Sequence, residues 1–295
     1  QTDGTVEEKW EIVTRTENNG EAILPDIAAT ILAKIEEKKI DKAEVAGVGI
    51  GVPGPVEETG EIPCAVNLHW GRKNIEKELG DLTGLAVKAG NDANVAALGE
   101  MWKGGGQGAK NLILVTLGTG VGGGIIVNEK IVTGAHGAGG EIGHAFVNPA
   151  ETKACNCGNK GCLEQYASAT GIARLAKEAL ESETEDSVLR TVKNISAKSV
   201  FDAYKEGDVL AGKIVDKFVA YLGNALAVFA CVSDPDVFVI GGGVSKAGQV
   251  LIDAVEKYYK AHAFTASKET PIKLATLGND AGIYGAAKLI LSKDN

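Results

Sequence analysis

The chain has 295 residues, of which 44% are hydrophobic and 23% charged, a composition typical of globular proteins and long enough for one large or two ordinary α/β domains. Its net charge of −9 argues against a nucleic-acid surface, which needs a basic patch. No uninterrupted apolar run reaches the roughly 18 residues that span a bilayer, so we expect neither a nucleic acid nor a membrane as a partner.

The first hundred residues predict alternating strands and helices. A turn at Thr2-Asp-Gly-Thr5 precedes an apparent strand over residues 6–13, with Trp10 and Ile12 on one face. Isoleucines recurring at every fourth position predict a helix over residues 21–39. The other elements expected here are a buried parallel strand at 45–52, ended by Pro53-Gly-Pro55, a loop at 65–70 and a strand at 85–89.

The motif Gly90-Asn-Asp-Ala-Asn94 joins the last of these strands to a helix that we expect to end near Lys103. Asn91 or Asp92 suits the N-cap of that helix. A carboxylate at the end of a strand and ahead of a helix also points into the crevice where α/β proteins bind ligands. The motif alone therefore leaves Asp92 open to a structural and a catalytic interpretation.

Two glycine-rich stretches follow. Lys103-Gly-Gly-Gly-Gln-Gly108 breaks regular structure, and we expect a domain boundary or hinge there. Strands at 112–117 and 122–127 flank the turn Gly118-Thr-Gly120, which would bring backbone N–H groups together as phosphate oxygens require. A glycine-rich hairpin can equally be only a hairpin, because this stretch lacks the Lys-Ser/Thr of a P-loop.

The second half of the chain also alternates between helices and strands. Periodicity predicts helices over 169–182, 198–206, 209–232 and 281–291, strands over 236–240 and 272–277, and a helix from about Ser245. An acidic surface turn is expected over 181–186. The three glycines at 241–243 fit a tight turn between strand and helix.

Three of the five cysteines, Cys155, Cys157 and Cys162, cluster behind His144. Thiolates with one imidazole suit Zn²⁺, and the glycines between the last two cysteines let that loop fold back. A disulfide would leave an odd cysteine, and idle core thiols rarely occupy a polar loop, so metal is the favoured interpretation. With four protein ligands the zinc would be structural, and such thiol usage favours a reducing cytoplasm.

Gly139-Gly-Glu-Ile-Gly-His144, followed by Cys-x-Cys-Gly-x-x-Gly-Cys-x-Glu164, resembles the signature of the ROK family of repressors, open reading frames and sugar kinases, and within it the bacterial glucokinases. The resemblance covers nearly the whole chain. Further stretches that are similar to the family are Gly51-Val-Pro-Gly-Pro55, Ala65-Val-Asn-Leu68, Gly90-Asn-Asp-Ala-Asn94, Leu117-Gly-Thr-Gly-Val-Gly-Gly-Gly124, Ile240-Gly-Gly-Gly-Val-Ser245 and Leu277-Gly-Asn-Asp-Ala-Gly282.

The resemblance implies an α/β, two-domain actin-like fold of the ribonuclease H-like kind, with a cleft between the domains. We expect a small domain at 1–104, with a C-terminal helix at 281–295 packing back on it, and a large domain at 105–280 that contains the zinc site. The family is also the basis for expecting a homodimer.

The resemblance further implies an ATP- and Mg²⁺-dependent hexose kinase, most like one that makes glucose 6-phosphate. Asp92 would be the general base that accepts the proton of the sugar's primary hydroxyl. The residues expected to bind the sugar are Asn91, Glu141, His144, Glu164 and Gly54, and those expected to bind ATP are Gly118, Thr119, Gly120, Gly241, Gly242 and Gly243. The zinc would fix the two loops that carry Glu141 and Glu164.

Members of the family open with a strand, an Asp-x-Gly-Gly-Thr phosphate loop and a second strand, which the sequence does not show ahead of Thr2. We expect such a leader in the full protein, because a sheet starting on its third strand would have an open edge. A chain beginning at Gln1 is accordingly expected to bind sugar but scarcely to phosphorylate it.

Other functions stay open at this point. One is a kinase for fructose, mannose or N-acetylmannosamine. Another is a sugar-sensing repressor of the same family without its basic helix-turn-helix domain. A third, an actin-like filament protein, explains neither the zinc ligands nor Glu141.

Overall fold

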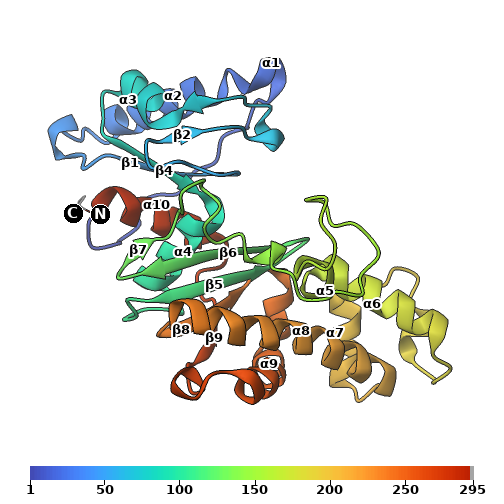
Figure 1. Ribbon diagram of the computed structural model, residues 1–295. Coiled ribbons are helices and arrows are strands. Elements are labelled where there is room, and N and C mark those ends of the chain that lie inside the picture. The colour runs from blue at the N-terminus through green and yellow to red at the C-terminus, as the bar shows by residue number, and fades with distance from the viewer. Residues whose placement is uncertain (293–295) are drawn as a thin grey trace.

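The computed structural model describes residues 1–292 and contains two α/β units (Figure 1). The larger unit is built on a five-stranded sheet of order β7-β6-β5-β8-β9, in which β5, β8 and β9 run parallel and β6 and β7 antiparallel to their neighbours. The two central strands are nearly continuous apolar runs, and both are buried. The strands are β5 (Leu112–Leu117), β6 (Val121–Val127), β7 (Lys130–Ile131), β8 (Val237–Gly241) and β9 (Ile272–Leu274).

The smaller unit contains two short sheets. β1 (Val48–Val52) pairs in parallel with β4 (Val87–Asn91), and β2 (Glu61–Ile62) pairs with β3 (Lys73–Asn74). Helices α2 (Ile23–Glu37) and α3 (Ile75–Thr83) pack against each other, after the short turn α1 (Glu17–Gly20). Within residues 1–292, β1 has β4 as its only strand partner, so its second edge is unpaired.

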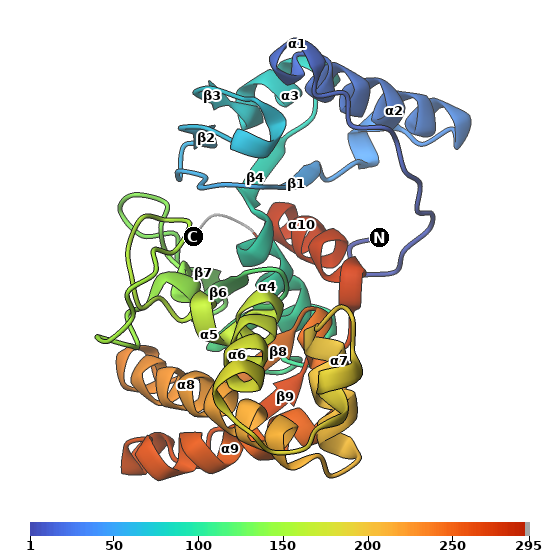
Figure 2. The same ribbon diagram turned by 90° about the vertical axis from the view of Figure 1, so that its right-hand side faces the viewer.

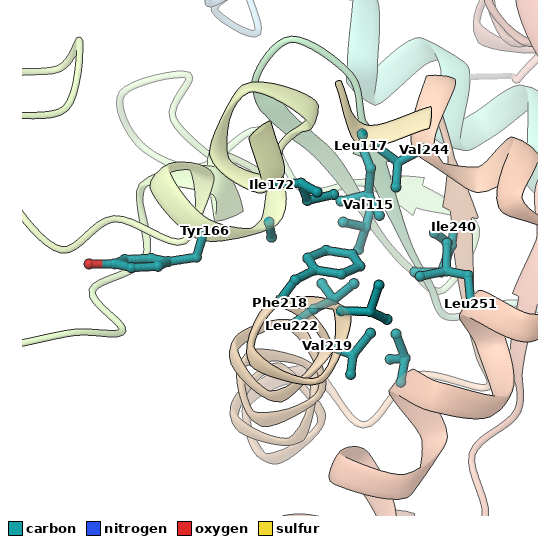
Figure 3. Packing of buried hydrophobic residues seen from close by; sticks show 14 of the residues in the cluster. Val115, Leu117, Tyr166, Ile172, Phe218, Val219, Leu222, Ile240, Val244 and Leu251 are labelled. Atoms are coloured by element: carbon teal, nitrogen blue, oxygen red, sulfur yellow. The ribbon is translucent and has the colours of Figure 1, made fainter. Parts of the chain in front are cut away.

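The core of the larger unit lies between the sheet and helix α8. Phe218 and Leu222 of α8 point at Val115 and Leu117 of β5, and all four are fully buried (Figure 3). By length and composition α8 could cross a membrane, but 56% of its most apolar window is buried in this core. The helices of this unit are α5 (Glu164–Ala167), α6 (Ala169–Ser182), α7 (Ala197–Lys205), α8 (Val209–Ser233) and α9 (Gln249–His262).

Helices α4 (Asp92–Lys103) and α10 (Ala281–Leu291) lie side by side between the two units, as both views show (Figures 1 and 2). Their backbones are in direct contact. A Cβ on Gly285 would lie 1.6 Å from the carbonyl oxygen of Val95, and one on Gly99 would lie 2.1 Å from that of Ala281. Glycine at both positions is therefore required for this packing. Because α10 also contacts β1 and β4, it joins the smaller unit to the larger one.

Most of the predicted elements are confirmed. The predicted helix at 169–182 coincides with α6, and the predicted strand at 112–117 coincides with β5. The helix expected over 209–232 ends one residue later, at Ser233, and the last helix spans Ala281–Leu291 as expected. The last residues of the range expected to pack on the small domain, 293–295, lie outside the described residues.

The prediction of a strand over residues 6–13 was wrong. This segment is neither strand nor helix, and its side chains contact α2 instead of joining a sheet. Glu8 forms ion pairs with Lys34 and Lys38, and the indole N–H of Trp10 donates to Thr30 Oγ1. The alternating pattern therefore reflects packing along a helix and not a strand with one buried face.

Two elements near the C-terminus are shorter or later than predicted. The helix expected from about Ser245 begins at Gln249, because Gly248 has φ 84° and separates it from a 3-10 turn at Gly243–Ala247. The strand expected over 272–277 ends at Leu274. The N–H groups of Thr276 and Leu277 donate to the Glu100 side chain and not to a neighbouring strand.

The contact between α4 and α10 predicts a position-specific effect of added methyl groups. Gly285→Ala should lower the free energy of unfolding by about 3 kcal/mol, because the new Cβ overlaps the backbone of Val95. Gly282→Ala in the same helix, where nothing lies within 4 Å of an added Cβ, should cause no loss. Urea unfolding followed by circular dichroism measures both. Equal effects of the two substitutions would contradict the close contact.

Candidate functional site

Asn91 ends strand β4 and caps helix α4. Its Oδ1 accepts hydrogen bonds from the backbone N–H groups of Ala93 and Asn94, at 3.0 and 3.1 Å. Its Nδ2 donates to the carbonyl oxygen of Gly54 at 3.1 Å. The side chain therefore fixes the start of the helix and ties it to the turn at the end of β1.

Asp92 follows as the first residue of α4 and is exposed. One carboxylate oxygen accepts from the N–H of Ala93 at 2.8 Å. A carboxylate in the first turn is stabilised by the positive end of the helix dipole. The capping role thus belongs chiefly to Asn91, and the Asp92 carboxylate remains available to a ligand.

The loop that carries Glu141 lies against the same region. A Cβ on Gly137 would lie 3.1 Å from Cβ of Pro55, and the side chain of Asn94 donates to the carbonyl oxygen of Gly139 at 3.4 Å. The loop leads into the short 3-10 helix Ile142–His144. Glu141 is half exposed, and its Oε2 lies 4.0 Å from Nε2 of His144. The structure therefore brings this loop to the start of α4.

The predicted metal ligands converge. One ligand atom from each of His144, Cys155, Cys157 and Cys162 lies within 4.8 Å of the others. Sγ of Cys155 is 3.8 Å from Nδ1 of His144, and the sulfurs of Cys157 and Cys162 are 3.6 Å apart. In a tetrahedron with metal–sulfur bonds of about 2.3 Å, two sulfurs are about 3.8 Å apart. The donor set and its spacing therefore fit one tetrahedral cation.

The thiols of this cluster differ in their acidity. Burial, followed by the hydrogen bonds with Cys157 and Cys155, raises the pKa of Cys162 to about 12. Burial also raises the pKa of Cys155, whereas a hydrogen bond from the backbone of Asn159 lowers that of Cys157. Packing several thiols together thus opposes their ionisation unless a cation compensates the charge.

Glu164 connects the cysteine cluster to the glycine turn. Its Oε2 accepts from the N–H of Val121 at 2.9 Å, and the thiol of Cys155 donates to its Oε1 at 3.7 Å. A Cβ on Gly120 would lie 2.1 Å from Oε2, so a side chain there would displace the carboxylate. The carboxylate predicted to bind sugar therefore lies directly against the turn predicted to bind phosphate.

The turn at 118–120 is held by the start of α6. The N–H of Ala169 donates to the carbonyl oxygen of Gly118 at 2.8 Å. The hydroxyl of Thr170 donates to the carbonyl oxygen of Thr119 at 2.7 Å. The predicted tight hairpin turn is confirmed, since Leu117 pairs with Val121. These contacts fix the conformation of the turn before any ligand is present.

The three glycines at 241–243 have different roles. Gly242 has φ 84°, and a Cβ on it would lie 2.6 Å from the carbonyl oxygen of Leu117, so packing alone requires glycine there. Gly243 has nothing within 4 Å of an added Cβ and lines a cavity of about 310 Å³. The other residues around this cavity are Ala169, Ser196, Ala197, Lys198, Phe201, Asp202, Lys205, Val244, Lys246 and Ala247.

A larger cavity, of about 840 Å³, runs along the unpaired edge of β1 between the N-terminal segment, α2 and α10. Its lining is mainly apolar, and Asp92 is the only predicted site residue that contributes to it. Because Glu141, His144 and Glu164 lie elsewhere, this cavity is not the place where the candidate site residues converge.

Sequence reasoning missed the side chains that support the cysteine loop. Gln165 Oε1 accepts from the N–H groups of Gly161 and Cys162 at 2.8 and 3.1 Å. Its Nε2 donates to the backbone carbonyl oxygen of Lys153. A glutamine three residues after a cysteine at a helix start was the available signal, because such a side chain can reach back to backbone N–H groups.

A buried charge network holds the other end of this loop. The hydroxyl of Tyr166 donates to Glu151 at 2.6 Å, and Arg174 pairs with the same carboxylate at 3.0 Å. The Tyr166 ring stacks on Tyr221 with centroids 4.1 Å apart. Burial opposes ionisation of Glu151, but the hydrogen bonds from Tyr166 and the backbone of Lys153, with the charge of Arg174, lower its pKa to about 2.

Comparison with known proteins defines the class. A sequence model of the ROK family matches residues 2–293, and the chain belongs to this family. The chain is 43% identical to a glucokinase of Halalkalibacterium halodurans over 100% of its own length and 91% of that protein.

Two further relatives bear on function. One is a ROK family glucokinase from Streptomyces griseus, whose crystal structure is in complex with glucose and AMPPNP. It superposes on this chain with a TM-score of 0.74 at 33% identity, and the match covers 97% of this chain and 92% of the glucokinase. A xylose repressor of Caldicellulosiruptor bescii is 30% identical over 89% of this chain and 68% of the repressor. The α/β sugar-kinase fold expected from the sequence is thereby confirmed.

The low pKa of Glu151 predicts an acid-dependent stability. An ionised Glu151 stabilises the folded state above its ordinary pKa of 4.5, and this contribution is lost as the pH falls toward about 2. Glu151→Gln should therefore cost roughly 2 kcal/mol at pH 7, and its difference from the wild type should shrink below about pH 4.5. Thermal unfolding between pH 7 and pH 3 measures this.

The control for this experiment is Glu206→Gln, which changes an exposed glutamate of the same unit. It should unfold like the wild type at every pH. A constant difference between Glu151→Gln and the wild type across the pH range would contradict the assignment of an ionised, paired Glu151.

Proposed function

We propose that this protein is an ATP-dependent hexose kinase that phosphorylates the primary hydroxyl of glucose. The observation that carries the proposal is the position of Glu164, whose carboxylate lies between the cysteine cluster and the glycine turn Gly118-Thr-Gly120. A carboxylate suited to sugar hydroxyls and a turn suited to phosphate are thus in direct contact. The glucokinase of Halalkalibacterium halodurans, at 43% identity, supports glucose as the substrate.

In this mechanism Asp92 is the general base. The oxygen of the sugar's primary hydroxyl attacks the γ-phosphorus of ATP, the bond from that phosphorus to the bridging oxygen breaks, and ADP leaves. The hydroxyl proton passes to the Asp92 carboxylate, which is exposed at the first turn of α4. Asn91, Glu141, His144 and Glu164 would hold the remaining hydroxyls. Gly54, whose carbonyl oxygen accepts a hydrogen bond from Asn91, would lie beside them.

The nucleotide would extend from the glycine turn to the 310 Å³ cavity. Both lie at the ends of neighbouring parallel strands, since β5 leads into Gly118 and β8 ends at Gly241. In α/β sheets this end of the strands is where ligands bind. Gly243 and Phe201 would contact the base and ribose, and Lys198, Lys205 and Lys246 give the cavity wall positive charge. Mg²⁺ would neutralise phosphate charge.

The cation held by the cysteine cluster would be a structural Zn²⁺. His144, Cys155, Cys157 and Cys162 supply the nitrogen and three sulfurs that this ion prefers, at a spacing that fits. The ion would fix the loop that carries Glu141 relative to the helix start that carries Glu164. Nδ1 of His144 points toward the cluster and its Nε2 toward Glu141, so Nε2 would be free to contact the sugar.

A sugar-sensing repressor is the second candidate, because the chain is similar to a xylose repressor. The two functions differ in chemistry, since a repressor needs sugar binding without phosphoryl transfer. A panel of hexoses with ATP and Mg²⁺, assayed for ADP release with the full-length protein, separates them. Turnover highest with glucose is expected; sugar binding without turnover would favour the repressor. We also expect a homodimer and a cytoplasmic location.

Asp92→Asn tests the general base. The amide is nearly isosteric and still accepts the N–H of Ala93, so the fold should be retained. We expect kcat to fall about 10²–10⁴-fold, because a positioned base contributes that much, while glucose affinity changes far less. A coupled ADP assay and calorimetric glucose titration measure the two quantities. A kcat near the wild-type value would assign the base to another residue.

Metal analysis tests the cysteine cluster. Purified protein should contain one zinc per chain, and Cys157→Ser should lose it and become less stable to heat. Cys231→Ser, which changes an exposed cysteine outside the cluster, should keep both the zinc and the stability of the wild type. Zinc-free wild-type protein of undiminished stability would rule out a structural metal.

A further inference from the structure

Glu100 is a fully buried carboxylate that the mechanism above does not use. It lies on α4 about two helical turns after Asp92, and it is 0% exposed. Buried carboxylates are costly unless hydrogen bonds or charges compensate them. Its surroundings should therefore explain why the chain places a charge between its two units.

Three backbone N–H groups compensate Glu100. Oε2 accepts from Gly105 at 2.8 Å and from Thr276 at 3.1 Å, and Oε1 accepts from Leu277 at 2.9 Å. The backbone carbonyl of Glu100 also accepts from the N–H groups of Gly104 and Gly106, both at 3.0 Å. All the donors are main-chain groups, so the side chain fixes the path of the backbone and not the position of other side chains.

The donors belong to two connecting segments. One links α4 to the large sheet, and the other links the large sheet to α10. Gly104–Gly106 lead from the end of α4 toward β5, and Thr276–Leu277 lead from β9 to α10. These segments are 170 residues apart in the sequence but meet at one side chain. Figures 1 and 2 show both helices between the smaller unit and the five-stranded sheet. Glu100 thus joins both connections at the place where the two units meet.

The glycines of the first connection fit this arrangement. A Cβ on Gly104 would lie 2.0 Å from Oε2 of Glu100, and one on Gly105 would lie 2.4 Å from the carbonyl oxygen of Leu274. The backbone can approach the carboxylate only because these side chains are absent. The glycine run that the sequence indicates as a boundary is therefore tightly packed around one buried charge.

We propose that Glu100 is a positioning residue for phosphoryl transfer. By fixing the C-terminal end of α4 to the connections on both sides of the large sheet, it sets where the N-terminal end of the same helix presents Asp92 relative to the turn at 118–120. This inference rests on the proposed kinase function. Its physical basis is that a rigid helix transmits a displacement at one end to the other, and a base misplaced by 1 Å can cost ~10²-fold in rate.

A glutamine cannot replace this carboxylate. Two oxygens that only accept are matched to three donors, whereas a Gln amide would turn its NH₂ group toward at least one N–H. Glu100→Gln therefore loses a hydrogen bond and creates a repulsive contact without changing volume. Gly104→Ala is a second variant, which keeps the charge and displaces the carboxylate by contact with the new methyl group.

The matched control is Asp236→Asn. Oδ2 of Asp236, an exposed carboxylate, accepts from the N–H groups of Lys110 and Asn111 at 2.9 and 2.8 Å and from the Asn111 side chain at 3.3 Å, so it too binds mainly backbone donors. Both segments that it joins lie within the larger unit, at the starts of β5 and β8. Losing this acceptor should lower stability without changing the position of α4.

The experiment measures kcat, glucose KM, zinc content and the melting temperature of the full-length protein and of all three variants, each assayed at the same interval below its own melting temperature. We expect Glu100→Gln and Gly104→Ala to lower kcat about 10- to 100-fold. Their glucose KM should change less, because three of the proposed sugar ligands, Glu141, His144 and Glu164, lie outside α4 and only Asn91 would move with Asp92. Their zinc content should be that of the wild type. Asp236→Asn should keep kcat within about twofold of the wild type, since only stability is changed.

Each outcome decides the proposal. If Glu100→Gln and Gly104→Ala both keep a kcat comparable with that of Asp236→Asn, Glu100 contributes to stability alone and the inference is wrong. If Glu100→Gln does not fold, Gly104→Ala gives the answer. Wild-type protein that phosphorylates no hexose would overturn the proposed function, and this inference with it. Active wild type, with Glu100→Gln and Gly104→Ala unaffected, would overturn the inference only.

Discussion

The backbone contact between α4 and α10 is the constraint on which the arrangement of the whole molecule depends. Two helices whose backbones touch at Gly99 and Gly285 can take only a narrow range of crossing geometries, because no side chain separates them. A third close contact, in which a Cβ on Gly49 of β1 would lie 1.7 Å from the carbonyl oxygen of Ala286, places the small sheet on the same helix. The position of one unit relative to the other is therefore determined by glycines, and the buried charge of Glu100 fixes the connections beside them.

The region between β7 and α6 is ordered in a different way. It contains short 3-10 and α-helical turns and isolated bridges instead of a sheet or a long helix, so few backbone bonds offset its conformational entropy. Its order comes from cross-links of side chains: the Cys/His cluster in the middle, Gln165 at the backbone of Gly161 and Cys162, and Glu151 between Tyr166 and Arg174. A metal bound to this cluster, as we propose, would restrict the unfolded chain and position Glu141 and Glu164 at the same time.

The sequence predicted those parts of the fold that depend on local patterns. Buried strands such as β5 and long helices such as α6 and α8 were found because apolar residues recur with the periodicity of each element. The strand predicted at 6–13 failed because the same alternation arises when an irregular segment packs along α2 through Trp10 and Glu8. The ligand cluster was predictable because metal coordination restricts residue types. Glu100 was not, because its partners are backbone groups of Gly105, Thr276 and Leu277, which any sequence supplies.

A glycine in a motif can be required by close packing or by a ligand, and the structure distinguishes the two cases. Gly242 is required by the carbonyl of Leu117, whereas Gly243 faces open space at a cavity; Gly120 is required by the carboxylate of Glu164. The last case joins the two functions. Gly120, which we propose contacts phosphate, is also the glycine that lets Glu164, the carboxylate proposed to bind sugar, approach, so the distance between the two substrates would depend on one backbone contact. Since Glu164 lies beside Cys155 and two residues after Cys162, a structural metal at the cluster would also determine how closely sugar and phosphate meet.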